Sequence, residues 1–244
     1  VAQVQKAIDE RLEFDFITLT ANGEPTLYPH LDELVKVLNS IKQDKKLLIL
    51  SNGTGVLNEC KFNAMLGLDV VKLSLDSAVE KTFFRVDRAA KSINLVQMID
   101  KMAEFKAVFK GQLVMEVLVV QGLNDSELEF KVLNEAFSRI KPDRVDIGSI
   151  DRPSAYPVKA VSDERLSKLA ALITSAPVLL PKRHLSGKGA EFSEAQLLKM
   201  LALRPQSELD ISAMSQNSKT RLQKLLESSK IWVEELAGVK FYRA

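Results

Sequence analysis

Cysteine is almost absent from this sequence, since Cys60 is the only one among 244 residues. A single thiol excludes an internal disulfide and any metal site built on several cysteines. Cys60 lies inside a helical pattern over 56–66, where we expect a packed thiol rather than a nucleophile. A chain without disulfides suits a reducing compartment, so the sequence predicts a cytoplasmic location.

Histidine, glycine-rich motifs and long apolar runs are scarce as well. His30 and His184 are the only histidines, and no spacing of Cys and His typical of a metal site occurs. Neither a Gly-x-Gly-x-x-Gly fingerprint nor a P-loop is present, and no apolar run approaches the length of a membrane span. The net charge of +2 argues neither for nor against nucleic acid as a partner. What remains is an ordinary globular composition, with 46% hydrophobic and 27% charged residues, and no membrane partner is expected.

Five apolar runs, rich in Val, Ile and Leu, alternate with helical patterns along the first 180 residues. The runs cover residues 14–20, 46–52, 69–76, 112–120 and 144–150, and they have the character of strands packed on both faces. Strands that alternate with helices pair in parallel through right-handed crossovers. A helical pattern is already under way at Val1, so we expect that one strand precedes it. The predicted fold class is α/β, a partial (β/α)6-type parallel barrel lacking its first strand.

The character of the sequence changes after residue 180. Residues 181–190, PKRHLSGKGA, combine two Gly, a Pro and several cationic side chains, as linkers do. Three helical patterns and a two-stranded ribbon around Ala237-Gly238 follow, which is the order of a winged helix. We therefore predict a core over 1–180, a linker over 181–190, and a small winged-helix-like α+β domain over 191–244.

Polar residues follow each of the five apolar runs. They occupy positions 20–24, 51–55, 74–77, 121–125 and 149–152. Ligands of parallel α/β folds bind at the carboxyl ends of the strands, so these segments are candidates for one site. The stretch Asn22-Gly23-Glu24-Pro25 allows two interpretations. Gly23 either permits a tight or positive-φ turn and nothing more, or lets a ligand approach the backbone beside a carboxylate.

Six stretches, taken together, resemble a known family. They are ITLTANGEPTLYPHL, LLILSNGT, VVKLSLDS, FFRVDRA, LVVQGLNDSE and VDIGSIDRP, spread over residues 14 to about 155. In their order and spacing they resemble the radical S-adenosylmethionine superfamily. The resemblance is to its cytosolic iron-sulfur oxidoreductases, which are related to wyosine-type tRNA modifiers and to activating enzymes. The Gly-Glu-Pro stretch followed by SNGT and LSLDS is the most specific part.

The resemblance implies S-adenosylmethionine as a cofactor and assigns parts of it to the strand ends. The first strand end would receive the amino group of the methionine part, and the next two would lie near its carboxylate and ribose. The last two strand ends would lie near the adenine. The residues concerned are Asn22, Gly23, Glu24 and Pro25; Ser51 and Asn52; Ser74 and Asp76; Gln121 and Gly122; and Gly148 and Ser149. Arg88 stands in an Asp-Arg-Ala triplet where the family has a triplet like Asn-Arg-Pro, which leaves its role open.

One departure concerns the 4Fe-4S cluster, which the family holds through a Cys-x3-Cys-x2-Cys motif after its first strand. This chain has only Cys60, so we expect the cluster loop to lie upstream, together with the strand expected before Val1. The resemblance implies that the intact protein is an oxidoreductase that cleaves S-adenosylmethionine and starts radical chemistry on an RNA or protein substrate. The fragment alone would be inactive.

Two alternatives stay open. One is a degenerate homologue that binds S-adenosylmethionine or another nucleoside without a cluster. The other is an α/β ligand sensor joined to a winged helix that binds nucleic acid or protein. Residues 218–230 carry Lys219, Arg221, Lys224 and Lys230 against the single acid Glu227, although acids elsewhere in the domain favour a solvated charged face. The substrate and the oligomeric state are not set by the sequence.

Overall fold

The structure is a computed structural model that describes residues 1–151, 156–180, 189–236 and 239–244. Residues 181–188 of the expected linker, with His184, and the ribbon turn at Ala237-Gly238 lie outside the described residues. The chain forms two compact units. The first comprises Val1–Ser149 and Lys159–Pro181, and the second comprises Ile150–Val158 and Lys182–Ala244.

The first unit is built on a six-stranded parallel sheet. Its strands are β1 Phe16–Leu19, β2 Lys46–Ser51, β3 Val70–Ser74, β4 Gln112–Val119, β5 Arg144–Ser149 and β6 Val178–Leu179. They lie side by side in the order of the sequence, and every neighbouring pair is parallel. The five predicted strands are confirmed, and β6, with two residues, is an addition. The α/β class and the partial parallel barrel are confirmed as well.

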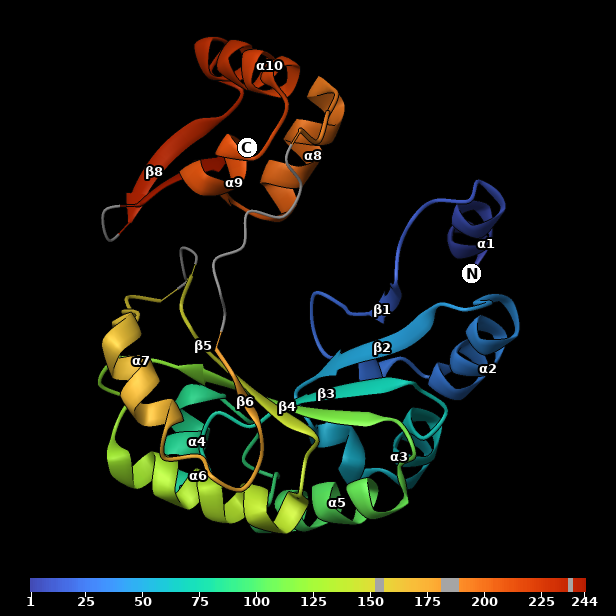
Figure 1. The fold of residues 1–244 in the computed structure, drawn as a ribbon, viewed down its shortest axis with the longest axis vertical. Coiled ribbons are helices and arrows are strands. Elements are labelled where there is room, and N and C mark those ends of the chain that lie inside the picture. The colour runs from blue at the N-terminus through green and yellow to red at the C-terminus, as the bar shows by residue number, and fades with distance from the viewer. Residues whose placement is uncertain (152–155, 181–188, 237–238) are drawn as a thin grey trace. The chain divides into compact units, whose positions relative to one another are not determined.

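The helices that follow β1 connect the strands and pack on one face of the sheet (Figure 1). The α-helices of this unit are α1 Ala2–Asp9, α2 Leu31–Ile41, α3 Glu59–Met65, α4 Glu80–Val86, α5 Leu95–Val108, α6 Glu127–Ile140 and α7 Asp163–Ala170. Two short 3-10 helices are η1 Pro25–Leu27 and η2 Thr54–Leu57. Phe105, Phe130 and Phe137 are fully buried between helices and sheet, against strand residues such as Leu47 and Leu73. None of the described helices is both long enough and apolar enough to cross a membrane.

Two local predictions were wrong. The helix expected over 56–66 is divided into η2 and α3, because the Asn58 side chain accepts a hydrogen bond from Lys61 N and caps a new helix. The same division leaves Cys60 exposed in the first turn of α3, so it is not the packed thiol expected. Helix α4, within the FFRVDRA region, was not predicted.

The face of the sheet opposite the helices is charged, which corrects the expectation of strands packed on both faces. Lys72 on β3 lies 3.0 Å from both Glu116 on β4 and Asp146 on β5, and Arg144 bonds Asp146 through two nitrogens. Burial alone would lower the pKa of Lys72 and raise that of Asp146. The ion pairs outweigh burial, so the pKa of Lys72 is raised and that of Asp146 is lowered. Lys72, Arg144 and Asp146 are therefore charged at neutral pH.

The second unit is a small α+β assembly. It contains α8 Glu194–Leu203, β7 Gln206–Ser207, α9 Glu208–Ser212, α10 Gln216–Glu227, β8 Trp232–Leu236 and β9 Val239–Arg243. The strands form an antiparallel sheet in the order β7-β9-β8. The three helices and the ribbon were predicted, while β7 was not. Leu197, Leu201, Leu222 and Leu225 form part of its own core. Its assignment as a winged helix stays a prediction.

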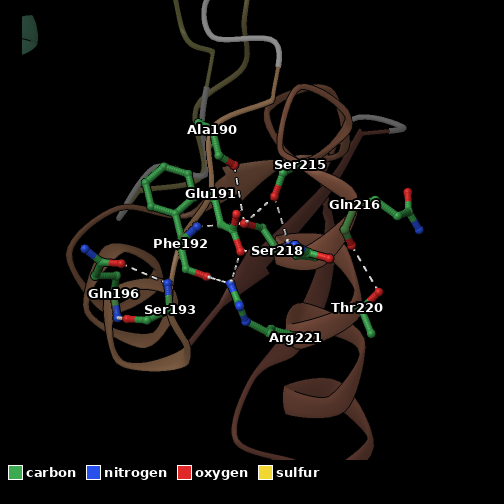
Figure 2. A network of polar contacts seen from close by, with 11 residues as sticks. Ala190, Glu191, Phe192, Ser193, Gln196, Ser215, Gln216, Ser218, Thr220 and Arg221 are labelled. Atoms are coloured by element: carbon green, nitrogen blue, oxygen red, sulfur yellow. Dashed lines mark hydrogen bonds and ion pairs between the residues drawn. The ribbon is translucent and has the colours of Figure 1, made fainter.

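A polar network fixes the start of α10 against the segment that enters α8 (Figure 2). The fully buried Ser218 accepts a hydrogen bond from Phe192 N at 2.7 Å and donates to Ala190 O. Arg221 donates to Phe192 O at 2.8 Å and pairs with Glu191 at 3.1 Å. Lys219 also donates to Ser212 O at 2.8 Å, so two of the four cations that suggested a nucleic-acid face are bonded within the domain, which weakens that alternative.

Candidate functional site

Glu24 ties the end of β1 to the end of β2. Its Oε1 accepts hydrogen bonds from Thr26 N at 2.9 Å, Thr26 Oγ1 at 2.7 Å and Ser51 Oγ at 2.8 Å. Its Oε2 accepts one from Asn52 N at 2.7 Å. The carboxylate also caps η1, where Pro25 takes the first helical position. Three of the predicted residues, Glu24, Ser51 and Asn52, are therefore in direct contact.

Gly23 lies beside this carboxylate with its backbone uncovered. A Cβ added there would meet no atom within 4 Å, and its φ is outside the left-handed region. The positive-φ turn that the sequence allowed is thus not what requires glycine at this position. What the missing side chain provides is open space over the backbone. Asn22 is exposed next to it.

The second strand end does contain a positive-φ glycine, at Gly53. Asn52 Oδ1 accepts hydrogen bonds from Thr54 N at 3.0 Å and Thr54 Oγ1 at 2.7 Å, which turns the chain into η2. Gly53 has φ +82°, and a Cβ there would collide with the Met102 methyl. The Asn52 side chain therefore builds the loop, and ligand contacts at this strand end would fall to the backbone and to the exposed edge of Asn52.

Two acidic residues approach one another beyond β3. Asp76 is 8% exposed and accepts a hydrogen bond from Leu118 N at 2.8 Å. Burial and, in smaller measure, the charge of Glu116 raise its pKa to about 6. Asp87 follows α4; its Oδ2 is buried without a hydrogen-bond partner among the described residues. Burial and the charge of Asp76 raise the pKa of Asp87 to about 8. Because the two charges repel each other, the carboxyls lose their protons one after the other, and Asp87 is the one that keeps its proton to the higher pH.

Asn124 holds the end of β4 to the end of β3; it lies in the candidate segment 121–125, but the sequence assigned it no role. This fully buried side chain donates to Asp76 O at 2.7 Å and Leu118 O at 2.9 Å, and it accepts from Val120 N. An Asn just after an apolar run was the available signal. Asp87 was also missed: the sequence drew attention to its neighbour Arg88, and nothing local indicates that Asp87 is buried.

The remaining predicted residues lie on the same edge of the sheet. Ser74 is paired in register with Glu116 and is half-buried. Gln121 and Gly122 are exposed after β4. The Ser149 hydroxyl donates a hydrogen bond to Val119 O and accepts one from Val161 N, so this side chain stabilises the fold. Gly148 lies on β5 in register with Leu118, and a Cβ there would meet nothing within 4 Å. The edge as a whole offers uncovered backbone and acceptors on five adjacent strands.

The described residues hold no group of three His, Cys, Asp or Glu side chains that could bind a metal ion. Because Cys60 is the single cysteine of the sequence, three thiolates cannot be assembled within it. The site therefore suits a zwitterionic or nucleoside ligand, and its residues do not fit an iron-sulfur cluster.

Comparison with known proteins connects this edge to a family. Residues 1–131 match the sequence profile of the radical SAM superfamily. A UPF0026 protein of Helicobacter pylori strain J99 is 34% identical over 249 residues, covering all of this chain and 80% of that protein. An S-adenosyl-L-methionine-dependent tRNA 4-demethylwyosine synthase of Methanocaldococcus jannaschii is 27% identical over 168 residues, which is 67% of this chain and 47% of the enzyme.

The fold agrees with that match. A radical SAM methyltransferase from Sphaerobacter thermophilus superposes with a TM-score of 0.58 at 14% identity, over 75% of this chain and 55% of the enzyme. A likeness at that identity concerns the fold alone. The family match itself covers more than half of the sequence, and it includes the ends of β1 to β4. The chain belongs to the radical SAM superfamily.

Proposed function

We propose that the protein is an enzyme that binds S-adenosylmethionine along the carboxyl edge of β1 to β5. With a 4Fe-4S cluster, it would start radical chemistry on an RNA or protein substrate. One observation carries the proposal: Glu24 joins the ends of β1 and β2 beside a Gly23 backbone that no atom covers. An ammonium group needs hydrogen-bond acceptors in open space. The carbonyls of Glu24 and Pro25 already accept Leu27 N and Tyr28 N within η1. The carbonyls of Asn22 and Gly23 and the second lone pair of Glu24 Oε2 would therefore meet that need.

The other strand ends supply complementary contacts. Ser74 and Asp76, which is held by Leu118 N, would receive ribose hydroxyls. The edge at Gln121, Gly122, Gly148 and Ser149 would pack against the adenine, because a methyl at either glycine would meet nothing within 4 Å. When protonated, Asp87 can donate a hydrogen bond to an acceptor atom of the ligand, which an ionised carboxylate would repel. When bound, S-adenosylmethionine supplies a carbon–sulfur bond that one electron can cleave.

The sequence lacks the ligands for the cluster that the proposal includes. Cys60 is its only thiol, and cluster binding requires several. The thiolates would have to come from outside these 244 residues. The same shortage favours a second candidate function, the binding of S-adenosylmethionine or another nucleoside without radical chemistry. Anaerobic reconstitution with iron and sulfide separates the two, since a cluster on a protein that includes further cysteines favours the enzyme.

Calorimetry with S-adenosylmethionine tests the binding half on this chain. Gly23→Val places two methyls where the ammonium would approach the backbone, so affinity should fall at least about tenfold. Gly23→Ala, with a single methyl, should have a smaller effect. Neither variant should unfold the protein, because the position is open and its φ is not left-handed. A folded Gly23→Val protein with unchanged affinity, or a wild-type chain that binds no S-adenosylmethionine, would contradict the proposal.

A further inference from the structure

A basic hollow lies beside the candidate site, where α4 ends. It has a volume of about 480 Å³ and is lined by Phe84, Arg85, Arg88, Ala89 and Lys91. The three cations are exposed, while Phe84 is half-buried. Phe84 packs edge-on against the buried Phe83 with the ring centroids 5.4 Å apart, which anchors this wall of the hollow to the core.

The hollow is held at the carboxyl edge of the sheet by a second set of contacts. Glu129 in the first turn of α6 accepts Thr82 Oγ1 at 2.6 Å and Ser77 Oγ at 2.5 Å. Helix α6 begins after the carboxyl end of β4, and α4 follows the carboxyl end of β3. The start of α4 is thus fixed next to Asp76. Asp87, at the end of α4, is near enough to Asp76 for that charge to raise its pKa, so a ligand in the hollow would lie near the candidate site.

The charge and backbone of this segment are unusual. Residues 80–91 contain Lys81, Arg85, Arg88 and Lys91 against two acids, Glu80 and Asp87. Asp87 is the buried acid whose pKa is raised to about 8, so it offsets little of that charge at neutral pH. Arg88 has a φ of 51°. A left-handed arginine is a strained conformation that the surrounding structure holds in place.

We propose that this hollow binds a phosphate group of a nucleotide-containing substrate while the reacting part of that substrate lies along the carboxyl edge of the sheet. Phosphate binding in the hollow does not depend on the proposed function. Only the position of the reacting part along the sheet edge rests on it. Arginine guanidinium groups bind phosphate oxygens in pairs, and an aromatic wall suits a base or sugar. RNA and a free nucleotide share this chemistry.

Binding measurements with three probes test the proposal: an unmodified tRNA transcript, GTP and inorganic pyrophosphate. The variant Arg85→Gln/Arg88→Gln/Lys91→Gln removes the cations of the hollow. The matched control Lys6→Gln/Lys131→Gln/Lys168→Gln removes the same charge from exposed positions of the same unit. We expect the hollow variant to bind tRNA at least about tenfold more weakly. The slope of log affinity against log salt concentration should become shallower by the equivalent of about two to three phosphate contacts. The control should lose less than about threefold.

The outcomes are distinct. Loss of tRNA binding alone identifies RNA as the source of the phosphate, and loss with all three probes identifies a small nucleotide. Equal losses in the two triple variants, or no loss in the hollow variant, would overturn the proposal. Arg88→Gly guards against a folding artefact, because glycine suits a positive φ while the guanidinium is removed. It should bind tRNA more weakly without a lower melting temperature.

Calorimetry with S-adenosylmethionine keeps this proposal separate from the proposed function. The hollow variant should bind S-adenosylmethionine as the wild type does, since none of its three residues is among those assigned to that ligand. A wild-type chain that binds tRNA through the hollow but no S-adenosylmethionine would contradict the proposed function and leave phosphate binding standing.

Discussion

The two ends of the parallel sheet use aspartate in opposite ways. At the amino end, Asp69 and Asp143 precede β3 and β5 and accept the backbone N–H groups of Leu47 and Leu113, each at 2.7 Å. Lys42 pairs with Asp69, and Lys106 pairs with Asp143. Burial would raise the pKa of Asp69, but the Leu47 amide and the Lys42 ammonium outweigh it and lower that pKa. At the carboxyl end, Asp76 and Asp87 have raised pKa values instead.

The difference separates stability from function. A carboxylate that bonds both an amide and a lysine strengthens the fold. A buried acid with no lysine partner among the described residues costs stability, as buried acids at functional sites often do. The volume of a hollow does not tell a ligand site from a structural feature. Another hollow of the first unit, with about 620 Å³, lies at the amino end, and its lining includes Lys46, Asp69, Lys110 and Asp143. Its two carboxylates are already bonded within the protein, so we assign no ligand to it.

Removing both amino-end carboxylates should have the largest effect on stability. Asp69→Ala and Asp143→Ala each leave the N–H of a buried strand residue without its partner, which costs about 1–3 kcal/mol. Because the two carboxylates bond different amides and different lysines, the two losses should roughly add, and the double variant should lose about 2–6 kcal/mol. Urea denaturation measures this. Asp44→Ala is the control, since that exposed aspartate pairs only with Lys45 among the described residues. A double variant as stable as this control would break the comparison.

Two glycines of the carboxyl end should respond differently to the same methyl group. Gly53→Ala should lower the free energy of unfolding by about 1–3 kcal/mol, because its φ is +82° and the methyl would collide with Met102. Gly23→Ala should change it by less than about 0.5 kcal/mol. Thermal denaturation of both variants checks the contrast. Equal losses would mean that Gly23 serves the turn rather than a ligand.

The raised pKa of Asp87 predicts a particular pH dependence. The folded value is about 8 and the unfolded value is about 4, so the folded state binds more protons between these pH values. The free energy of unfolding should therefore fall as pH rises from about 4 to 8. Asp87→Asn removes this cost and should stabilise the chain by about 1–3 kcal/mol at pH 8.5 and hardly at pH 4. A gain that is the same at both pH values would show that the asparagine acts through packing.

Lys72 lies between the two ends of the sheet and should give the smallest effect. Lys72→Met removes its ion pairs with Glu116 and Asp146, but Arg144 still pairs with Asp146. We expect a loss of about 0–1 kcal/mol, because partly exposed ion pairs contribute little. Lys131→Met on α6 is the matched control in urea denaturation. A loss of unfolding free energy above about 3 kcal/mol would show that the ion pairs of this face stabilise the fold as strongly as the amino-end carboxylates do.

The strands were predictable because each is a run of Val, Ile and Leu bounded by polar loop residues. The run from Lys46 to Ser51 illustrates this, and its SNGT end also marked the site. Strand β6, Val178–Leu179, is too short to leave a pattern, and its strand character comes from pairing with Val145 and Asp146. Single charges within apolar runs, such as Lys72 and Glu116, were a sign of a polar face that the prediction of strands packed on both faces overlooked. The parallel register decides that they meet.

The site could be predicted only as a set of strand ends. Glu24 and Ser51 were named from the sequence, yet their hydrogen bond spans 27 residues and depends on β1 lying beside β2. The burial of Asp87 depends on how α4 packs, and α4 itself was not predicted. Its raised pKa was therefore out of reach, because that shift arises from tertiary burial and from Asp76.

The strand order β1-β2-β3-β4-β5-β6 has a consequence for how the chain can fold. Each strand joins the sheet beside the strand that precedes it in the sequence, so every addition meets an edge that is already synthesised. Chains emerge from the ribosome amino end first, and local pairings form faster than distant ones. The first unit can therefore assemble one strand and helix at a time during translation, with each helix covering the same face of the growing sheet.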